Sequence, residues 1–135
     1  MHPAVVLGVP LMDADHATIE LMLERVATTS DPDLPALFAE IEAEVTAHFA
    51  REEVLMAEHR APVAHCHQAQ HALLLGEFAA ARPIAEAGDA AALRAAFDRL
   101  AEFVAGHVAS VDRVTAQFLG GTLDTALVER LRLPE

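Results

Sequence analysis

Apolar residues recur at steps of three and four along most of the chain, which is the spacing of one face of an α-helix. Breaker residues divide this pattern into four segments that are each long enough to form a helix. The predicted helices cover approximately residues 13–30, 33–58, 63–86 and 89–119. Short connections favour antiparallel neighbours, so the pattern predicts an all-α, up-down four-helix bundle.

The two ends of the chain lie outside this pattern. Residues 1–12 contain two prolines and a glycine, so we expect an extended arm before a first helix that is capped by Asp13. The tail over residues 122–135 is amphipathic, and we expect a short C-terminal helix there that packs on the end of the bundle. The length is that of a single domain covering residues 1–135.

The composition supports a helical fold and narrows the range of partners. The chain is 53% hydrophobic and contains neither Trp nor Tyr, and Ala and Leu are strong helix formers. Nine basic residues against 21 acidic ones give a formal net charge of −12. Such a surface repels phosphate groups, which disfavours nucleic acids and anionic membranes as partners.

The sequence also bears on compartment. The apolar stretch near the N-terminus is too short to span a bilayer, and no basic segment precedes it as in a secretory signal. Cys66 is the only cysteine, so an intrachain disulfide cannot form. We therefore expect a cytoplasmic protein.

The predicted inward faces carry polar residues of the types that bind metal ions. Each of the four helices contributes one or two of them, and pairs four residues apart project from one face about one turn apart. The candidate ligands are His16, His48, Glu52, His67, His71, His107 and Asp112. A metal site inside a helix bundle is built from such inward-pointing groups on facing helices.

Spacing indicates how two ions could share the histidines. His67 and His71 lie one turn apart and can bind one ion together, and His107 can reach the same ion from the fourth helix. His16 and His48 come from the other two helices and suit a second ion.

The two carboxylates are placed between these groups. Glu52 lies one turn beyond His48 and can bridge the ions. Asp112 follows His107 by five residues, about 140° around and about 7.5 Å along an ideal α-helix. We therefore expect Asp112 to point sideways from His107, as a second bridging carboxylate.

Histidines and carboxylates on inward helix faces also occur in proteins of different kinds. A single buried histidine is more often bonded to a carbonyl group. Here, however, all seven groups would have to lie on inward helix faces by coincidence. Burying the unpaired carboxylate of Glu52 is also costly. Zinc, or no metal, in a structural or regulatory module is an alternative, although structural zinc sites are closed and four-coordinate. A ferritin-like site requires about four carboxylates and two histidines, whereas this set has only two carboxylates and has five histidines.

These motifs resemble the hemerythrin family of di-iron, four-helix-bundle oxygen binders. The resemblance covers residues 12–16, 48–53, 62–71 and 103–112. It implies two iron ions, bridged by Glu52, Asp112 and an oxo or hydroxo group. One iron would be held by His67, His71 and His107, and the other by His16 and His48.

The resemblance also implies a ligand pocket and a function. The iron held by two histidines would keep an open position for O2, lined by Ile19, Phe49, Phe103, Val104 and Val108. The implied function is reversible binding of O2, or of another small diatomic or peroxide ligand, for storage, delivery or sensing, without enzymatic turnover.

Two departures from the family pattern keep an enzymatic alternative open. Phe103 stands where a tryptophan is often found, and Thr115 stands where a tyrosine is common. A pocket with fewer large aromatic residues is easier for solvent and reductants to reach. The alternative is therefore a di-iron peroxidase, an oxidase or a nitric-oxide-handling enzyme on the same scaffold.

Overall fold

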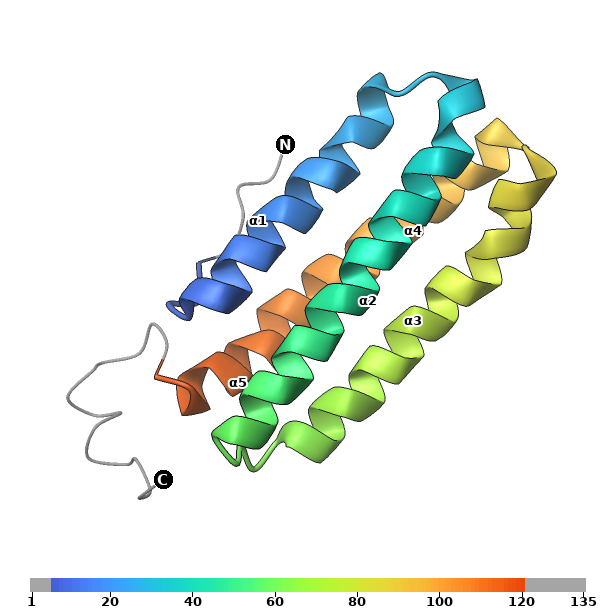
Figure 1. Ribbon diagram of the computed structural model, residues 1–135. Helices are drawn as coiled ribbons and strands as arrows, with labels where there is room; N and C mark the ends of the chain where they lie inside the picture. The colour runs from blue at the N-terminus through green and yellow to red at the C-terminus, as the bar shows by residue number, and fades with distance from the viewer. Residues whose placement is uncertain (1–5, 121–135) are drawn as a thin grey trace.

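The computed structural model describes residues 6–120, and these form a four-helix bundle in which successive helices run in opposite directions (Figure 1). The four long helices are α1 (Pro10–Glu24), α2 (Leu34–Glu58), α3 (Ala64–Ala87) and α4 (Ala90–His107). The connecting and terminal elements are the 3-10 turns η1 (Arg25–Thr28) and η2 (Asp31–Asp33), the π-helical turn η3 (Val108–Asp112) and the short helix α5 (Arg113–Phe118). The predicted all-α bundle is confirmed, and the expected C-terminal helix lies outside the described residues.

The first helix begins earlier than its sequence predicts. Pro10 is the first residue of α1, because a proline in the first turn needs no N–H donor and already has a helical φ. Asp13 therefore does not cap this helix. Its carboxylate instead accepts hydrogen bonds from the backbone N–H groups of Leu7 (2.7 Å) and Gly8 (2.9 Å), and so holds the described part of the arm against α1.

The turn between α3 and α4 is built by two adjacent residues. Gly88 ends α3 with a φ of +72°, a left-handed conformation that glycine adopts without steric cost. Asp89 caps α4, because its side chain accepts a hydrogen bond from the N–H of Ala92 at 3.1 Å. This compact connection sets α4 antiparallel to α3 and places His107 opposite the first turn of α3.

Two apolar clusters flank the middle of the bundle. The larger is centred on Phe38, whose ring lies 6.0 Å from Phe78 and 5.9 Å from Phe97, measured between centroids. The smaller joins the arm, the start of α1 and the region of α5, and includes Leu7 and Met12. A cluster of polar side chains lies between them, so apolar side chains separate it from both ends of the bundle.

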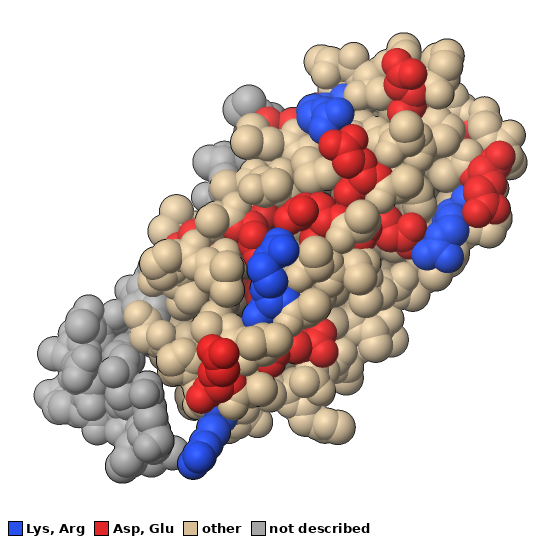
Figure 2. All heavy atoms as spheres, in the orientation of Figure 1, with Lys and Arg blue, Asp and Glu red and all other residues tan. Residues whose placement is uncertain are grey.

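The surface contributes little to holding the helices together. On the face shown in Figure 2, acidic side chains outnumber basic ones, and arginines stand beside several of them. Arg25 pairs with Glu40 at 3.1 Å, and Arg94 pairs with Asp31 at 2.8 Å. Exposed pairs of this kind are weak, so the buried residues determine the packing. Within residues 6–120, no helix combines the length and the apolar character needed to cross a bilayer.

Candidate metal centre

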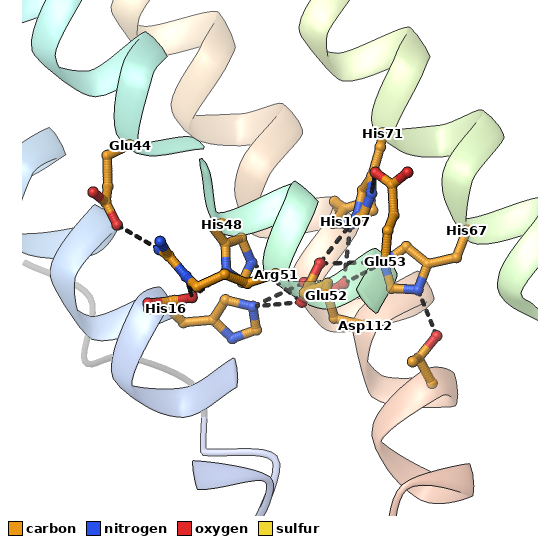
Figure 3. A network of polar contacts seen from close by, with 12 residues as sticks. His16, Glu44, His48, Arg51, Glu52, Glu53, His67, His71, His107 and Asp112 are labelled. Carbon is orange, nitrogen blue, oxygen red and sulfur yellow. Dashed lines mark hydrogen bonds and ion pairs between the residues drawn. The ribbon is translucent and has the colours of Figure 1, made fainter. Parts of the chain in front are cut away.

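Seven polar side chains meet in the interior of the bundle (Figure 3). They are His16 from α1, His48 and Glu52 from α2, His67 and His71 from α3, and His107 and Asp112 from α4 and the π turn. None of them is more than 8% exposed. The structure thus brings together all seven residues that the sequence indicates as candidate ligands, although they come from separate helices.

The seven residues form two overlapping sets. Within each set, one nitrogen or oxygen atom per residue lies within 4.8 Å of the atoms of the other members. The first set is Glu52, His67, His71, His107 and Asp112, and the second is His16, His48, Glu52 and Asp112. Both carboxylates belong to both sets, whereas each histidine belongs to only one.

The two oxygens of Asp112 face different sets. Its Oδ1 lies 2.8 Å from Nε2 of His67 and 3.0 Å from Nε2 of His107. Its Oδ2 lies 2.9 Å from Nε2 of His16. One carboxylate therefore offers an oxygen to each side of the cluster.

Glu52 divides its oxygens in the same way. Its Oε1 lies 3.0 Å from Nε2 of His71 and 3.5 Å from Nε2 of His67. Its Oε2 lies 3.2 Å from Nε2 of His48 and 3.6 Å from Nε2 of His16. Each of the two carboxylates therefore places one oxygen toward the three-histidine set and the other toward the two-histidine set.

Most of these facing atoms are close together without forming hydrogen bonds. The buried atoms without a hydrogen-bond partner include Nε2 of His16, His48, His67 and His107, both oxygens of Asp112, and Oε2 of Glu52. A buried polar atom left unpaired costs on the order of 1–3 kcal/mol. Cations between the nitrogens and the oxygens would pair all of these atoms, so the cluster fits a metal site, with a donor set suited to iron or zinc.

The electrostatics of the cluster also favour a cation. Burial lowers the pKa of His16 and of His67, but the contacts of each with Asp112 and then Glu52 outweigh it and raise both pKa values to about 9. Burial raises the pKa of Glu52 and of Asp112, and the facing histidines more than reverse this, so both pKa values lie below their ordinary range. Without a metal, protons on His16 and His67 balance the two carboxylates, and a bound metal would displace them.

Asp112 reaches the cluster because the backbone widens after His107. The residues that follow His107, Val108–Asp112, form a π-helical turn, which holds one more residue per hydrogen-bonded ring than an α-helix. This turn brings Oδ1 of Asp112 to 3.0 Å from Nε2 of His107. The expectation that Asp112 points sideways from His107 is wrong, because it assumed an ideal α-helix.

In three of the histidines, Nδ1 contacts a further polar residue outside the set of seven, while Nε2 faces the cluster (Figure 3). The Nδ1 contacts are His48 with Asp15 at 3.0 Å, His67 with Thr115 at 2.5 Å, and His71 with Glu53 at 3.0 Å. Such partners fix the orientation of the ring and present its other nitrogen to a metal. Asp15 is itself held by Nε of Arg51 at 2.8 Å.

Sequence reasoning missed these partners as site residues. Asp15 and Glu53 are each adjacent to a candidate ligand, so on their own helices they lie about 100° away from it. Thr115 follows Asp112 by three residues and stands out in the sequence only as a departure from the family pattern. The signal that could have identified Asp15 and Glu53 is a polar residue next to a candidate ligand, from where its side chain can reach a histidine on a neighbouring helix.

The five expected pocket residues differ in their environment. Ile19, Phe49 and Val108 are buried, and Val104 is partly buried between the two apolar clusters. Phe103 differs from these four residues because it is 46% exposed, and its place in the pocket stays a prediction. It immediately precedes Val104, and one residue along a helix turns the side chain by about 100°, which here directs it toward solvent.

Comparisons with known proteins agree with this geometry. The Hemerythrin HHE cation binding domain family matches residues 7–119. A protein named Bacteriohemerythrin from Ralstonia nicotianae (strain ATCC BAA-1114 / GMI1000) is 33% identical over 116 residues, which are 86% of this chain and 85% of that protein. No solved structure matches. From this match and this relative, the chain belongs to the hemerythrin family.

Proposed function

We propose that this chain binds O2 reversibly at a di-iron centre formed by the seven clustered residues, for oxygen storage, delivery or sensing. The observation that carries the proposal is the divided orientation of Glu52 and Asp112, each with one oxygen toward three histidines and the other toward two. Two cations bridged by two carboxylates would suit this arrangement. Membership of a cation-binding family and the similar bacteriohemerythrin support iron as the metal and O2 as the ligand.

The inequality of the two sides suggests where a ligand would bind. The first set offers three imidazoles and two carboxylate oxygens, whereas the second offers two imidazoles and two oxygens. An ion held by His16 and His48 would have fewer protein donors around it and would keep room for a ligand, whereas three histidines would surround the other ion more completely.

The protein's part is to hold these donors and to keep water away. Phe49 stacks on His71, with ring centroids 3.9 Å apart and planes inclined by 7°, and fixes that imidazole on its apolar side. Ile19 and Val108 are buried in the apolar clusters that close the site. Bound iron would supply the reversible electron transfer to O2 that binding and release require. Exclusion of water by the apolar side chains slows irreversible oxidation.

The proposal is tested by metal content and absorption. Protein from iron-replete cells should contain two irons per chain and show charge-transfer bands in air, which disappear on anaerobic reduction and return with O2. His67→Ala should lose iron and the bands. His65→Ala is the matched control, because His65 lies two residues away in α3 and is exposed.

Two results would contradict the proposal. A colourless protein without iron would refute the di-iron centre itself. Steady consumption of peroxide or nitric oxide, abolished by His107→Ala, would support the enzymatic alternative instead of a reversible carrier.

A further inference from the structure

We propose that the two halves of the centre load metal in a fixed order: the His67–His71–His107 half fills first, and the His16–His48 half fills last and empties first. The ordering rests on the dinuclear site of the proposed function but not on its oxygen chemistry. It assigns positioning roles to Thr115, Glu53 and Asp15, three residues that hold imidazoles without facing the metal position.

The three-histidine half is organised before any metal arrives. Thr115 is 1% exposed, and its Oγ1 lies 2.5 Å from Nδ1 of His67. Glu53 holds Nδ1 of His71 at 3.0 Å, while Phe49 stacks on the face of the same ring. His67 and His71 also come from successive turns of one helix, so their spacing is fixed by the backbone of α3.

In the two-histidine half, only one of the two imidazoles is fixed by a hydrogen-bond partner. His48 is held at Nδ1 by Asp15, which is anchored in turn by Arg51. His16 is 6% exposed, and neither of its ring nitrogens has a hydrogen-bond partner among the described residues. Its polar contacts are on the metal side, with Asp112 at 2.9 Å and Glu52 at 3.6 Å.

This difference makes the affinities of the two halves unequal. One half offers three imidazoles, two of them fixed from behind, and the other offers two imidazoles with one fixed. Loss of a single outer partner typically weakens metal binding by about 10- to 100-fold. Because Glu52 and Asp112 are shared, the first ion also aligns the oxygens that the second ion needs.

The order gives the protein a dependence on metal supply. The open coordination position of the proposed function lies in the His16–His48 half, which loses its metal first. A chain with one metal therefore keeps a filled, folded three-histidine half and lacks the ligand position. Oxygen binding then follows the free iron concentration over the range of the weaker step.

Cobalt(II) titration of the metal-free, full-length chain tests the order. Ligand-field absorption and calorimetry should show two steps of one ion each, with affinities at least about 10-fold apart. Thr115→Val should weaken the tighter step by about 10- to 100-fold, and Asp15→Asn should weaken the looser step by a similar factor. The exposed residues Thr46 and Asp98 provide matched controls, because Thr46→Val and Asp98→Asn should leave both steps unchanged.

Release of cobalt provides a second measurement that starts from loaded protein and so does not require the metal-free chain to be folded. A chelator should remove one ion quickly and the other slowly, and His16→Ala should contain only the slow ion. A single concerted step in both experiments would overturn the order. So would an Asp15→Asn variant that weakens only the tighter step.

The two proposals fail in different ways. Ordered cobalt binding in a protein whose iron form does not bind O2 reversibly would leave the order standing and refute the proposed function. Reversible O2 binding in a protein that loads both metals together would refute the order alone.

Discussion

In the metal-free protein, the charge balance of the buried cluster depends on Glu52, because its carboxylate faces four histidines. The distances from its oxygens to their Nε2 atoms range from 3.0 to 3.6 Å, and Glu52 is 1% exposed. Glu52→Gln keeps the shape of the side chain and removes its negative charge. We expect the metal-free variant to be less stable than the wild-type chain at pH 6 and to lose most of this difference by pH 10.

The sign follows from the histidines. Burial lowers the pKa of His16 and of His67, and Asp112 and Glu52 raise it from 6.5 to about 9. A raised pKa means that the folded protein binds protons more tightly than the unfolded chain does. Its contribution to stability is therefore complete below pH 6.5 and is lost as the pH rises through about 9.

The magnitude follows from the same shift. A rise of this size corresponds to about 3 kcal/mol for each histidine. Asp112 contributes more than Glu52 to both shifts, so through these two histidines the neutralisation of Glu52 lowers the free energy of unfolding by at most about 3 kcal/mol at pH 6. This is a large part of the roughly 5–15 kcal/mol that stabilises an ordinary domain.

Urea denaturation followed by far-ultraviolet circular dichroism, with a chelator present, measures this difference at pH 6 and pH 10. The core around Phe38 packs the helices together through apolar side chains that need no metal, so we expect the helices to persist without it. Glu102→Gln is the control, because Glu102 is exposed on α4. An equal loss of stability at both pH values would refute the reasoning, since it would show that Glu52 acts through packing and not through its charge.

Three further predictions concern protons, the core and the surface. Metal binding at pH 7 should release protons from His16 and His67, whose pKa values are raised to about 9, and a calorimetric titration in buffers of different ionisation enthalpy should show the release shrinking toward pH 10. Phe38→Ala should lower the free energy of unfolding by about 3–5 kcal/mol in urea, while the metal-bound absorption spectrum stays unchanged, because Phe38 packs on Phe78 and Phe97 away from the cluster. Phe103→Ser should change the rate of O2 dissociation less than twofold in stopped-flow measurements, because Phe103 is 46% exposed; a larger change would show that it lines the pocket.

The sequence predicts most of the fold because each long helix carries its own signals. Periodic apolar positions define α2 and α4, and Gly88 with Asp89 marks the turn between α3 and α4. The start of α1 is harder to place because a proline such as Pro10 is compatible with two different local structures. A proline interrupts a helix that is already formed, but it is favourable in the first turn, and only the packing of the arm decides between these cases.

The candidate site is predictable to the extent that its helices are regular. His67 and His71 lie one turn apart in an ordinary α-helix, so their spacing alone places them on one face. His107 and Asp112 are five residues apart, and the π turn between them changes the angle at which Asp112 leaves the helix. Nothing in the apolar pattern marks this turn, because its first residue, Val108, and Ala116 in the helix that follows are both buried.

The partners of the histidines escape prediction for a different reason, which concerns pairs of helices. Asp15 in α1 holds His48 in α2, Glu53 in α2 holds His71 in α3, and Thr115 in α5 holds His67 in α3. In each case the supporting residue and the supported ring belong to different helices, so periodicity along one helix cannot pair them. These contacts span the helix interfaces themselves, and a change in helix packing must therefore also change how the imidazoles are presented. We therefore expect metal affinity in this bundle to fall with any mutation that shifts the helices relative to one another.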